Sequence, residues 1–362
     1  MEKVFKAPRN SNIELYRIIC MFLIVAHHFV VNSGLWEMIF ENPSDVNSLY
    51  LGVFGLWGKT GINCFMMITG YYMCKSNITF QKLFKLVMWI FFYNIVVFVF
   101  MFVMGYESIS PMRILRLFLP IWGLKQNFTS CFLAFYLTIP FLNILVKNMN
   151  QLQHKLLIAL MIVLFTILGS VPGFEVSVNY VFWFAVIYFI ASYIRFYPNQ
   201  CMNNSKLWGI LSCFVIILSL ISLYGIPYVL SGFKSIGLFP HFHMECNRLF
   251  PVLISVCTFL WFKNISIPNN GVINTIAASC FGVLLIHTNS DAMRQWLWKD
   301  VAKCTTCINM DFTTLVVYSF AVVLAVYIVC TLVDIFRMKF IEPGYMSIVS
   351  KLTNKIRDRY GI

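Results

Sequence analysis

Long apolar segments recur along the whole chain, and they constrain its fold more than any other feature. Most are near twenty residues long, which is the length that an α-helix needs to cross a hydrocarbon core of about 30 Å. A membrane β-barrel would instead show segments of about ten residues in which polar and apolar residues alternate. Charged residues make up 11% of the chain, whereas they make up about a quarter of a soluble domain. We therefore expect an all-α membrane protein.

The apolar segments predict a polytopic helix bundle with about ten transmembrane helices. The expected spans are residues 13–31, 51–73, 84–104, 127–146, 156–171, 179–196, 207–225, 248–263, 271–290 and 312–334. Residues 1–340 would form this transmembrane domain, and residues 341–362 a short basic cytoplasmic tail.

The basic residues indicate the orientation, because Lys and Arg in short loops stay on the cytoplasmic side. They precede the first span and follow every second one: Lys3, Lys6 and Arg9; Lys75, Lys82 and Lys85; Lys147 and Lys155; Arg195 and Lys206; Lys263; Arg337 and Lys339. Both termini are therefore predicted to be cytoplasmic. The net charge of +13 is explained by attraction to anionic lipid headgroups rather than by nucleic acid.

Two groups of basic residues go against this rule. Arg113, Arg116 and Lys125 lie in the second outer loop, and Arg294, Lys299 and Lys303 lie in the last one.

Two ionisable residues interrupt the first span. Arg17 and His28 are eleven residues apart, so on a helix they differ by about 20° in direction and by about 16 Å in depth. Such groups are costly inside a membrane and usually mark a functional path. Glu14 lies one turn before Arg17 and can pair with it. His27 points about 80° away from the Arg17 face and is expected to pack.

Other polar residues are candidates for the same site. His287, at the end of the ninth span, is expected near the depth of the first-span pair, where it shares a site or makes an interhelical hydrogen bond. Asn63 and Thr69 in the second span line a cavity or allow close helix packing. Lys82 and Lys85, in the loop after that span, lie where a phosphate-bearing ligand would arrive, or are ordinary cytoplasmic cations.

Two outer loops contain residue types that bind zinc. His241, His243 and Cys246 lie in one, and Cys304 and Cys307 in the other, but neither group offers a complete ligand set. No metal site is predicted. The Cys304 and Cys307 spacing is compatible with a disulfide, a metal pair or two free thiols.

Taken together, these residues resemble the acyltransferase-3 family of bacterial multi-pass membrane acyltransferases, which modify surface polysaccharides and other glycans. Asn12 to Arg17, followed by ten residues and His28, is similar to the family's first-helix pattern. Thr69 stands where that family usually has Ser, and Lys82 and Lys85 stand where it often has Arg. Four further segments resemble the family in the family's order, namely residues 61–72, 132–143, 188–195 and 279–287.

The resemblance implies transfer of an acyl group, usually acetyl, from cytoplasmic acyl-CoA to a hydroxyl of a cell-surface glycan in the bacterial plasma (inner) membrane. Acetyl-CoA would be a substrate, and no permanently bound cofactor is expected. The partners would be acyl-CoA, a glycan and the lipid bilayer, without nucleic acid. His28 would act as general base with His287 in support. The donor and substrate contacts would come from Glu14, Arg17, Asn63, Thr69, Lys82 and Lys85.

Two other function classes agree with the same pattern. Ten spans with buried polar groups also describe transporters and flippases, although paired Gly- or Pro-broken segments in two halves are not evident. A non-catalytic component of polysaccharide assembly is the other class. Within the enzyme class, direct transfer and transfer through a covalent histidine or cysteine intermediate both stay open.

Overall fold

The computed structural model describes residues 9–125, 127–174, 176–234 and 237–360, so the predicted cytoplasmic cations Lys3 and Lys6 lie outside it. The described residues form helices and no β-strand. Three π-helical segments, Ile162–Ile167, Gln295–Val301 and Arg337–Ile341, extend neighbouring helices. The α-helices are α1 Ser11–Val31, α2 Leu35–Glu41, α3 Val46–Phe54, α4 Gly58–Met73, α5 Phe80–Val103, α6 Pro111–Phe118, α7 Phe128–Asn148, α8 Gln151–Met161, α9 Leu168–Ser170, α10 Tyr180–Phe196, α11 Ser205–Leu230, α12 Leu249–Asn264, α13 Gly271–His287, α14 Asp291–Arg294, α15 Phe312–Phe336 and α16 Glu342–Tyr360.

The described part of the chain contains seven helical segments that are long and apolar enough to cross a membrane. An eighth arises when α13 and the helical segment Asp291–Asn309, which meet at 97°, count as one broken span. Two shorter apolar helices, α10 and α12, have 17 and 16 residues. The prediction of a helical membrane protein is thus confirmed, while ten crossings and two cytoplasmic termini stay predictions. The seven segments are Ser11–Val31, Val46–Met73, Phe80–Val103, Phe128–Asn148, Gln151–Ser170, Ser205–Leu230 and Phe312–Lys351.

Capping side chains explain where the structure departs from the predicted boundaries. The Thr79 hydroxyl accepts from the Lys82 backbone N–H at 3.3 Å and starts α5 earlier than expected. Lys82 and Lys85 therefore lie on the first turns of α5 rather than in a loop. Ser290 accepts from the Met293 N–H at 3.1 Å and starts α14, so the predicted span 271–290 ends at His287.

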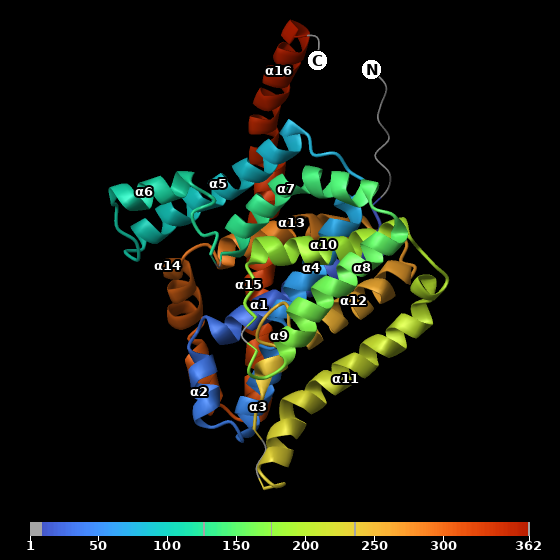
Figure 1. Cartoon of the computed structure of the whole chain (residues 1–362). Helices are drawn as coiled ribbons and strands as arrows, with labels where there is room; N and C mark the ends of the chain where they lie inside the picture. Colours follow the sequence, from blue (N-terminus) through green and yellow to red (C-terminus); the bar gives the residue numbers. More distant parts are fainter. Residues whose placement is uncertain (1–8, 126, 175, 235–236, 361–362) are drawn as a thin grey trace.

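The helix α4 lies at the centre of the bundle, where it packs against α1, α10 and α12 (Figure 1). Gly61 allows the close approach of α1, because a Cβ atom there would lie 2.8 Å from Ile24 and 3.0 Å from the Cys20 carbonyl oxygen. On the other side of α1, α13 packs against both α1 and α15. The two histidines expected at one depth, on α1 and α13, thus lie on neighbouring helices.

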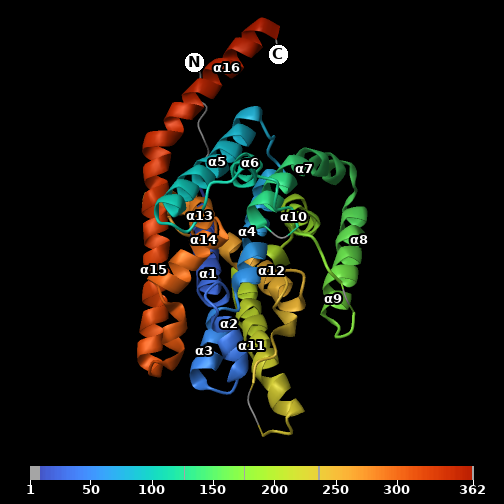
Figure 2. The same cartoon turned by 90° about the vertical axis from the view of Figure 1, so that its left-hand side faces the viewer.

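The peripheral helices turn apolar side chains outward, as lipid-facing helices do. The helix α11 lies along the edge of the bundle in Figure 1 and α15 lies along the edge in Figure 2, while α16 projects beyond the bundle in both views. Large apolar side chains are exposed on α5, α7, α11 and α15, among them Val99, Val103, Phe141, Ile144, Phe214, Ile217, Val317 and Leu324.

Candidate active site

A pair of histidines joins α1 to α13. Nδ1 of His28 lies 2.9 Å from Nε2 of His287, and Nδ1 of His287 lies 2.6 Å from the Val283 carbonyl oxygen. His287 is fully buried, while His28 is partly exposed to a pocket. The prediction that the two imidazoles lie at one level is confirmed, and the two rings form an interhelical hydrogen bond.

The hydrogen bonds of this pair define its tautomers when both rings are neutral. A carbonyl oxygen can only accept, so Nδ1 of His287 carries its proton and Nε2 is the acceptor. Nδ1 of His28 must then be the donor to that atom. The Nε2 atom of His28 keeps its lone pair, and no described residue hydrogen-bonds to it. This arrangement leaves a basic nitrogen facing the pocket.

His27 packs against the neighbouring helix α4. Its Nδ1 lies 2.5 Å from the Gly55 carbonyl oxygen. A Cβ atom on Gly58 would lie 2.2 Å from the imidazole, so this ring occupies space that any other residue at position 58 would need. The position agrees with the packing role that its direction on the first helix predicts.

The pocket in front of His28, here called the His28 pocket, is built from several helices and loops. The Lys59 ammonium donates to the Tyr180 hydroxyl at 2.8 Å and lies 3.5 Å from Glu245. The remaining polar lining comes from His27, Asn32, Asn127, Thr129, Thr288 and Arg294, and the apolar lining from Met21, Ile24, Ile62, Phe65, Phe128 and Leu284, with other residues.

A second pocket lies at the other end of α1 and is here called the Arg17 pocket. Arg17, Thr69, Lys82 and Lys85 line it together with Arg9, so it gathers four cations. The sequence prediction placed four of these five residues at the donor site. The Arg17 pocket thus has the charge that a phosphate-bearing ligand requires.

The cations of the Arg17 pocket differ in how they are held. Arg17 donates from Nη1 to the Glu14 carboxylate at 2.7 Å, which neutralises part of its charge. Lys85 pairs with Glu342 of α16. Lys82 donates to the Ser76 hydroxyl and the Asn77 carbonyl oxygen, both at 2.8 Å, and has no carboxylate partner among the described residues.

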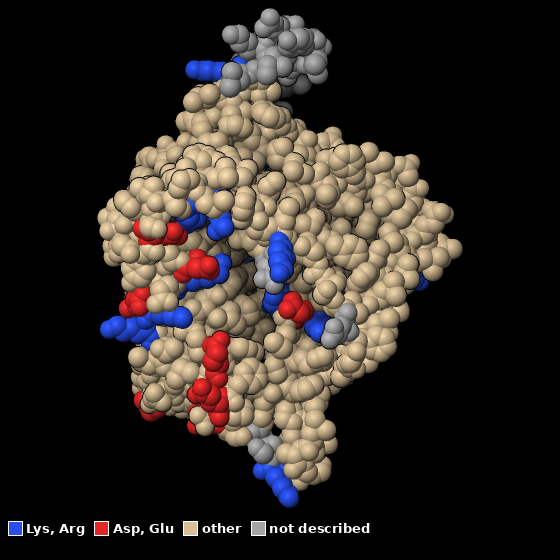
Figure 3. Space-filling view, turned by 60° about the vertical axis from the view of Figure 1, so that its left-hand side comes forward, with Lys and Arg blue, Asp and Glu red and all other residues tan. Residues whose placement is uncertain are grey.

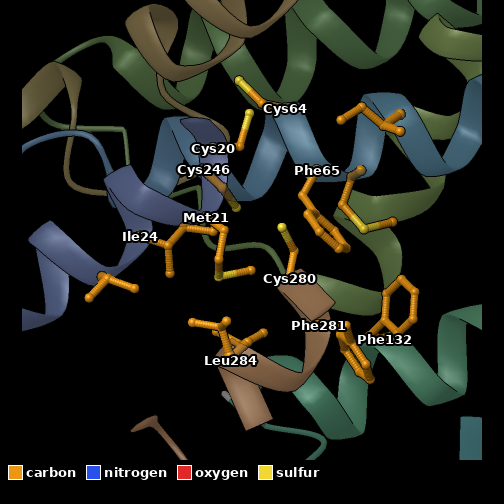
Figure 4. Close-up of a cluster of buried hydrophobic side chains, with 14 of the residues drawn as sticks. Cys20, Met21, Ile24, Cys64, Phe65, Phe132, Cys246, Cys280, Phe281 and Leu284 are labelled. Atoms are coloured by element: carbon orange, nitrogen blue, oxygen red, sulfur yellow. The ribbon is translucent and has the colours of Figure 1, made fainter. Parts of the chain in front are cut away.

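The two pockets share Phe65 of α4 as a common wall. Figure 4 shows this ring beside an apolar cluster from α1, α7 and α13. The Phe132 and Phe281 rings, which line the Arg17 pocket, have centroids 5.4 Å apart. Met21 and Leu284 of the same cluster line the His28 pocket. The wall between the pockets is therefore made of apolar side chains.

Asn63 and Thr69, which the sequence also predicted for the site, make hydrogen bonds within the helix bundle. Asn63 is fully buried, donates to the Cys246 carbonyl oxygen at 2.7 Å and accepts from Trp183 at 2.9 Å, and it lines neither pocket. Thr69 faces the Arg17 pocket, but its hydroxyl donates to the Phe65 carbonyl oxygen of its own helix at 3.0 Å. Asn63 thus holds helices together, and Thr69 offers the pocket its oxygen lone pairs.

A buried ion pair beside the Arg17 pocket escaped the sequence prediction. Asp334 and Arg337, both fully buried, are joined at 2.7 Å. The Asp334 carboxylate also accepts from Trp89 at 3.0 Å and from Tyr93 at 2.7 Å. Arg337 reaches Glu342 at 2.9 Å and so fixes α16 against the pocket. The available signal was an aspartate three residues before an arginine at the end of an apolar span.

The histidines of the predicted outer loop do not converge. His241 lies 3.2 Å from the Ser170 carbonyl oxygen, and Nε2 of His243 lies 2.8 Å from the Ser219 hydroxyl. Burial lowers the pKa of His243 to about 4. Cys304 and Cys307 are buried free thiols, the third of the alternatives for this pair. Among the described residues no three His, Cys, Asp or Glu side chains are grouped as metal ligands would be.

A family model described as an acyltransferase domain matches residues 10–334, which is nearly the whole chain. No curated protein and no solved structure is significantly similar to it.

Proposed function

Because this chain belongs to the acyltransferase-3 family, we propose that it transfers an acyl group from cytoplasmic acyl-CoA to a hydroxyl of a glycan in the bacterial plasma membrane. Acetyl-CoA is the proposed donor, and the reaction is an O-acetylation. One observation carries the proposal: the unpaired Nε2 of His28 faces a pocket that shares Phe65 with a pocket lined by four cations.

The Arg17 pocket is the proposed donor site. Coenzyme A has a phosphate-bearing head and a long flexible arm that ends in the thioester. Arg17, Lys82 and Lys85 would bind the phosphates, since cations near phosphate form strong charge-assisted hydrogen bonds. The arm would pass Thr69 and Phe65 toward His28, a depth of about 16 Å along α1.

The chemistry requires one base. Nε2 of His28 would take the proton from the acceptor hydroxyl while the hydroxyl oxygen attacks the thioester carbon. The C–O bond forms, the C–S bond breaks, and the proton on His28 then passes to the coenzyme A thiolate. Ester and free thiol are the products. General base catalysis of this kind contributes about 10² to 10⁴ in rate.

His287 would act through His28 as a positioning residue. Its proton on Nδ1 is held by the Val283 carbonyl oxygen, so its Nε2 accepts from His28 and orients that ring. When His28 takes a proton on Nε2, the hydrogen bond to His287 stabilises the imidazolium that forms.

The decisive experiment incubates the purified protein with radiolabelled acetyl-CoA and isolated surface glycan, and measures label in the glycan. We expect labelled ester and an equal amount of free coenzyme A. The His28→Ala variant, normalised to folded protein, should lose transfer. A flippase or an assembly component would leave acetyl-CoA intact and would be unaffected in this assay. Acetyl transfer by His28→Ala at the parental rate would contradict the proposed role of His28.

A further inference from the structure

The outer-loop cations that depart from the positive-inside rule gather around the His28 pocket. Of the six such residues, Arg113, Arg116, Lys125 and Arg294 line this pocket or one that adjoins it. Lys and Arg are disfavoured in loops on the outer side of a membrane, so the position of these four residues around one pocket requires an explanation in the pocket itself.

Two pockets flank the His28 pocket and are continuous with it through shared residues. Arg113 and Arg116 line the first, which has Asn127, Thr129 and Thr288 in common with the His28 pocket. Lys125 and Arg248 line the second, which has Lys59 and Tyr180 in common with it. Figure 3 shows a hollow in one face of the molecule, bordered by Lys and Arg side chains and also by Asp and Glu side chains.

Six of the described Lys and Arg residues line the His28 pocket and its two neighbours, and three of the six already have carboxylate partners. Arg113 is held by both oxygens of Glu107 at 2.9 and 2.6 Å. Lys59 lies 3.5 Å from Glu245, and Arg294 lies 2.8 Å from Asp291. These three pairs are close to neutral.

The other three cations have no carboxylate partner among the described residues. They are Arg116, Lys125 and Arg248. The guanidinium of Arg116 lies over the Trp122 ring, 5.3 Å from its centroid. Two nitrogens of Arg248, Nε and Nη1, are buried without any hydrogen-bond partner. A buried charged donor without a partner is costly, so a ligand that supplied an acceptor would be bound favourably.

We infer that the acceptor is an anionic glycan, in which a carboxylate or a phosphate is held by Arg116 on one side of His28, and by Lys125 and Arg248 on the other. This inference rests on the proposed function, because it places the acceptor in the His28 pocket. A guanidinium matches the two oxygens of a carboxylate or phosphate with parallel hydrogen bonds. The neutral part of the glycan would lie against Asn127, Thr129 and Thr288, with its hydroxyl toward His28.

The test uses the full-length protein in uncharged detergent and three matched tetrasaccharides. One contains glucuronic acid, the second is its carboxyl-reduced neutral form, and the third carries a phosphate in place of the carboxylate. The dissociation constant is measured without donor by calorimetry, and acetyl transfer is measured separately. We expect at least one anionic form to bind about tenfold more tightly than the neutral form, and high salt to remove the difference.

Paired variants locate the effect. Arg116→Gln and Arg248→Gln should each reduce the preference for the anionic form toward that of the neutral form. Lys299→Gln is the matched control, because Lys299 is an exposed outer-loop cation that lines none of these pockets. A preference that Lys299→Gln reduces as strongly as Arg116→Gln would reveal general attraction to the surface and would overturn the inference.

The outcomes separate the inference from the proposed function. Equal binding of all three forms, or binding of none, overturns the anionic acceptor even when acetyl transfer to another glycan is observed. If the anionic form binds more tightly and Arg116→Gln abolishes this preference, the anionic acceptor is supported. If the same preparation shows no acetyl transfer, the result counts against the proposed reaction alone. Preference between the carboxylate and phosphate forms identifies the source of the charge.

Discussion

His28 and His287 are 259 residues apart in the chain, yet Nδ1 of the first donates to Nε2 of the second across 2.9 Å. The bond connects the last turn of α1 to the last residue of α13, and the Val283 carbonyl oxygen orients the second ring. A chain of two imidazoles with a defined proton order therefore ends in one free nitrogen at the pocket.

Replacing either histidine should reduce acetyl transfer to different degrees. His28→Ala removes the proposed base, so the maximal rate at saturating acetyl-CoA should fall by about 10² to 10⁴. His287→Ala keeps the base but removes its orienting partner, so a smaller loss is expected. Rates normalised to folded protein measure both. Losses of equal size would show that the two rings act as one catalytic unit, and an unchanged His287→Ala rate would show that orientation is unimportant.

Replacing Arg17 should affect use of the donor. Arg17→Lys keeps the charge but loses the planar fork that Glu14 holds at 2.7 Å, so KM for acetyl-CoA should rise about tenfold while kcat changes less. Lys206→Gln is a suitable control, since Lys206 is exposed and lies away from the Arg17 pocket. A fall in folded protein with unchanged KM would mean that Arg17 supports the fold instead.

Gly282→Ala should destabilise the protein through the buried ion pair. A Cβ atom at position 282 would lie 2.2 Å from Cγ of Asp334, whose carboxylate is fixed by Arg337, Trp89 and Tyr93. Overpacking of this kind costs about 1–3 kcal/mol. Gly271→Ala on the same helix is the control, because its Cβ would meet open space. Thermal unfolding in detergent compares them, and equal midpoints would contradict the expectation.

The stability of the protein should fall in mild acid because of His243. Burial lowers its pKa from 6.5 to about 4, so between these values the unfolded chain binds a proton that the folded protein excludes. The contribution is fully present above pH 6.5 and is lost progressively as the pH falls toward 4. His243→Gln can keep the hydrogen bond to Ser219 but cannot be protonated. Its unfolding midpoint should therefore decline less between pH 6.5 and 4.5, and identical slopes for both proteins would refute this.

Cysteine labelling can test the predicted orientation. Cys201 is exposed in the connection between α10 and α11, which the basic residues Arg195 and Lys206 assign to the cytoplasm. An impermeant maleimide should label it in lysed but not in intact cells, and Cys201→Ser should remove the signal. A cysteine introduced at the exposed outer residue Glu41 should react in intact cells. Labelling of Cys201 and Glu41→Cys on the same side would contradict the topology.

The sequence sufficed for the features that depend on helical geometry alone. Direction and depth on a helix predicted that Arg17 and His28 would share one face at different depths and that His287 would lie level with His28. In the structure Arg17 and His28 line two pockets that share Phe65, and His28 lies 2.9 Å from His287. The roles of these residues stay predictions. Lys82 and Lys85 were predicted in a loop, whereas they lie on α5. The Thr79 cap that starts α5 early is a weak signal in a short loop.

Contacts between distant segments were beyond the sequence argument. The partnership of Asp334 with Trp89 and Tyr93 depends on how α15 packs against α5, which no periodicity specifies. The placement of Arg116 of α6, Lys125 and Arg248 in the pockets that adjoin the His28 pocket likewise depends on segments far apart in the chain. In the sequence, Arg116 and Lys125 were exceptions to a rule of topology, and in the structure they line the two pockets that adjoin the His28 pocket.

Phe65 has a consequence for the membrane as an electrical barrier. Two polar pockets that approach each other from opposite ends of α1 would form a pore for protons and ions if water joined them. The apolar wall of Phe65, Met21 and Leu284 resists wetting, and narrow hydrophobic constrictions block ion flow for this reason. A thioester arm, which is uncharged along most of its length, can enter such a wall where a hydrated ion cannot. In the proposed reaction, the acyl group of a cytoplasmic thioester would thus reach the outer side of the membrane while the membrane potential is kept.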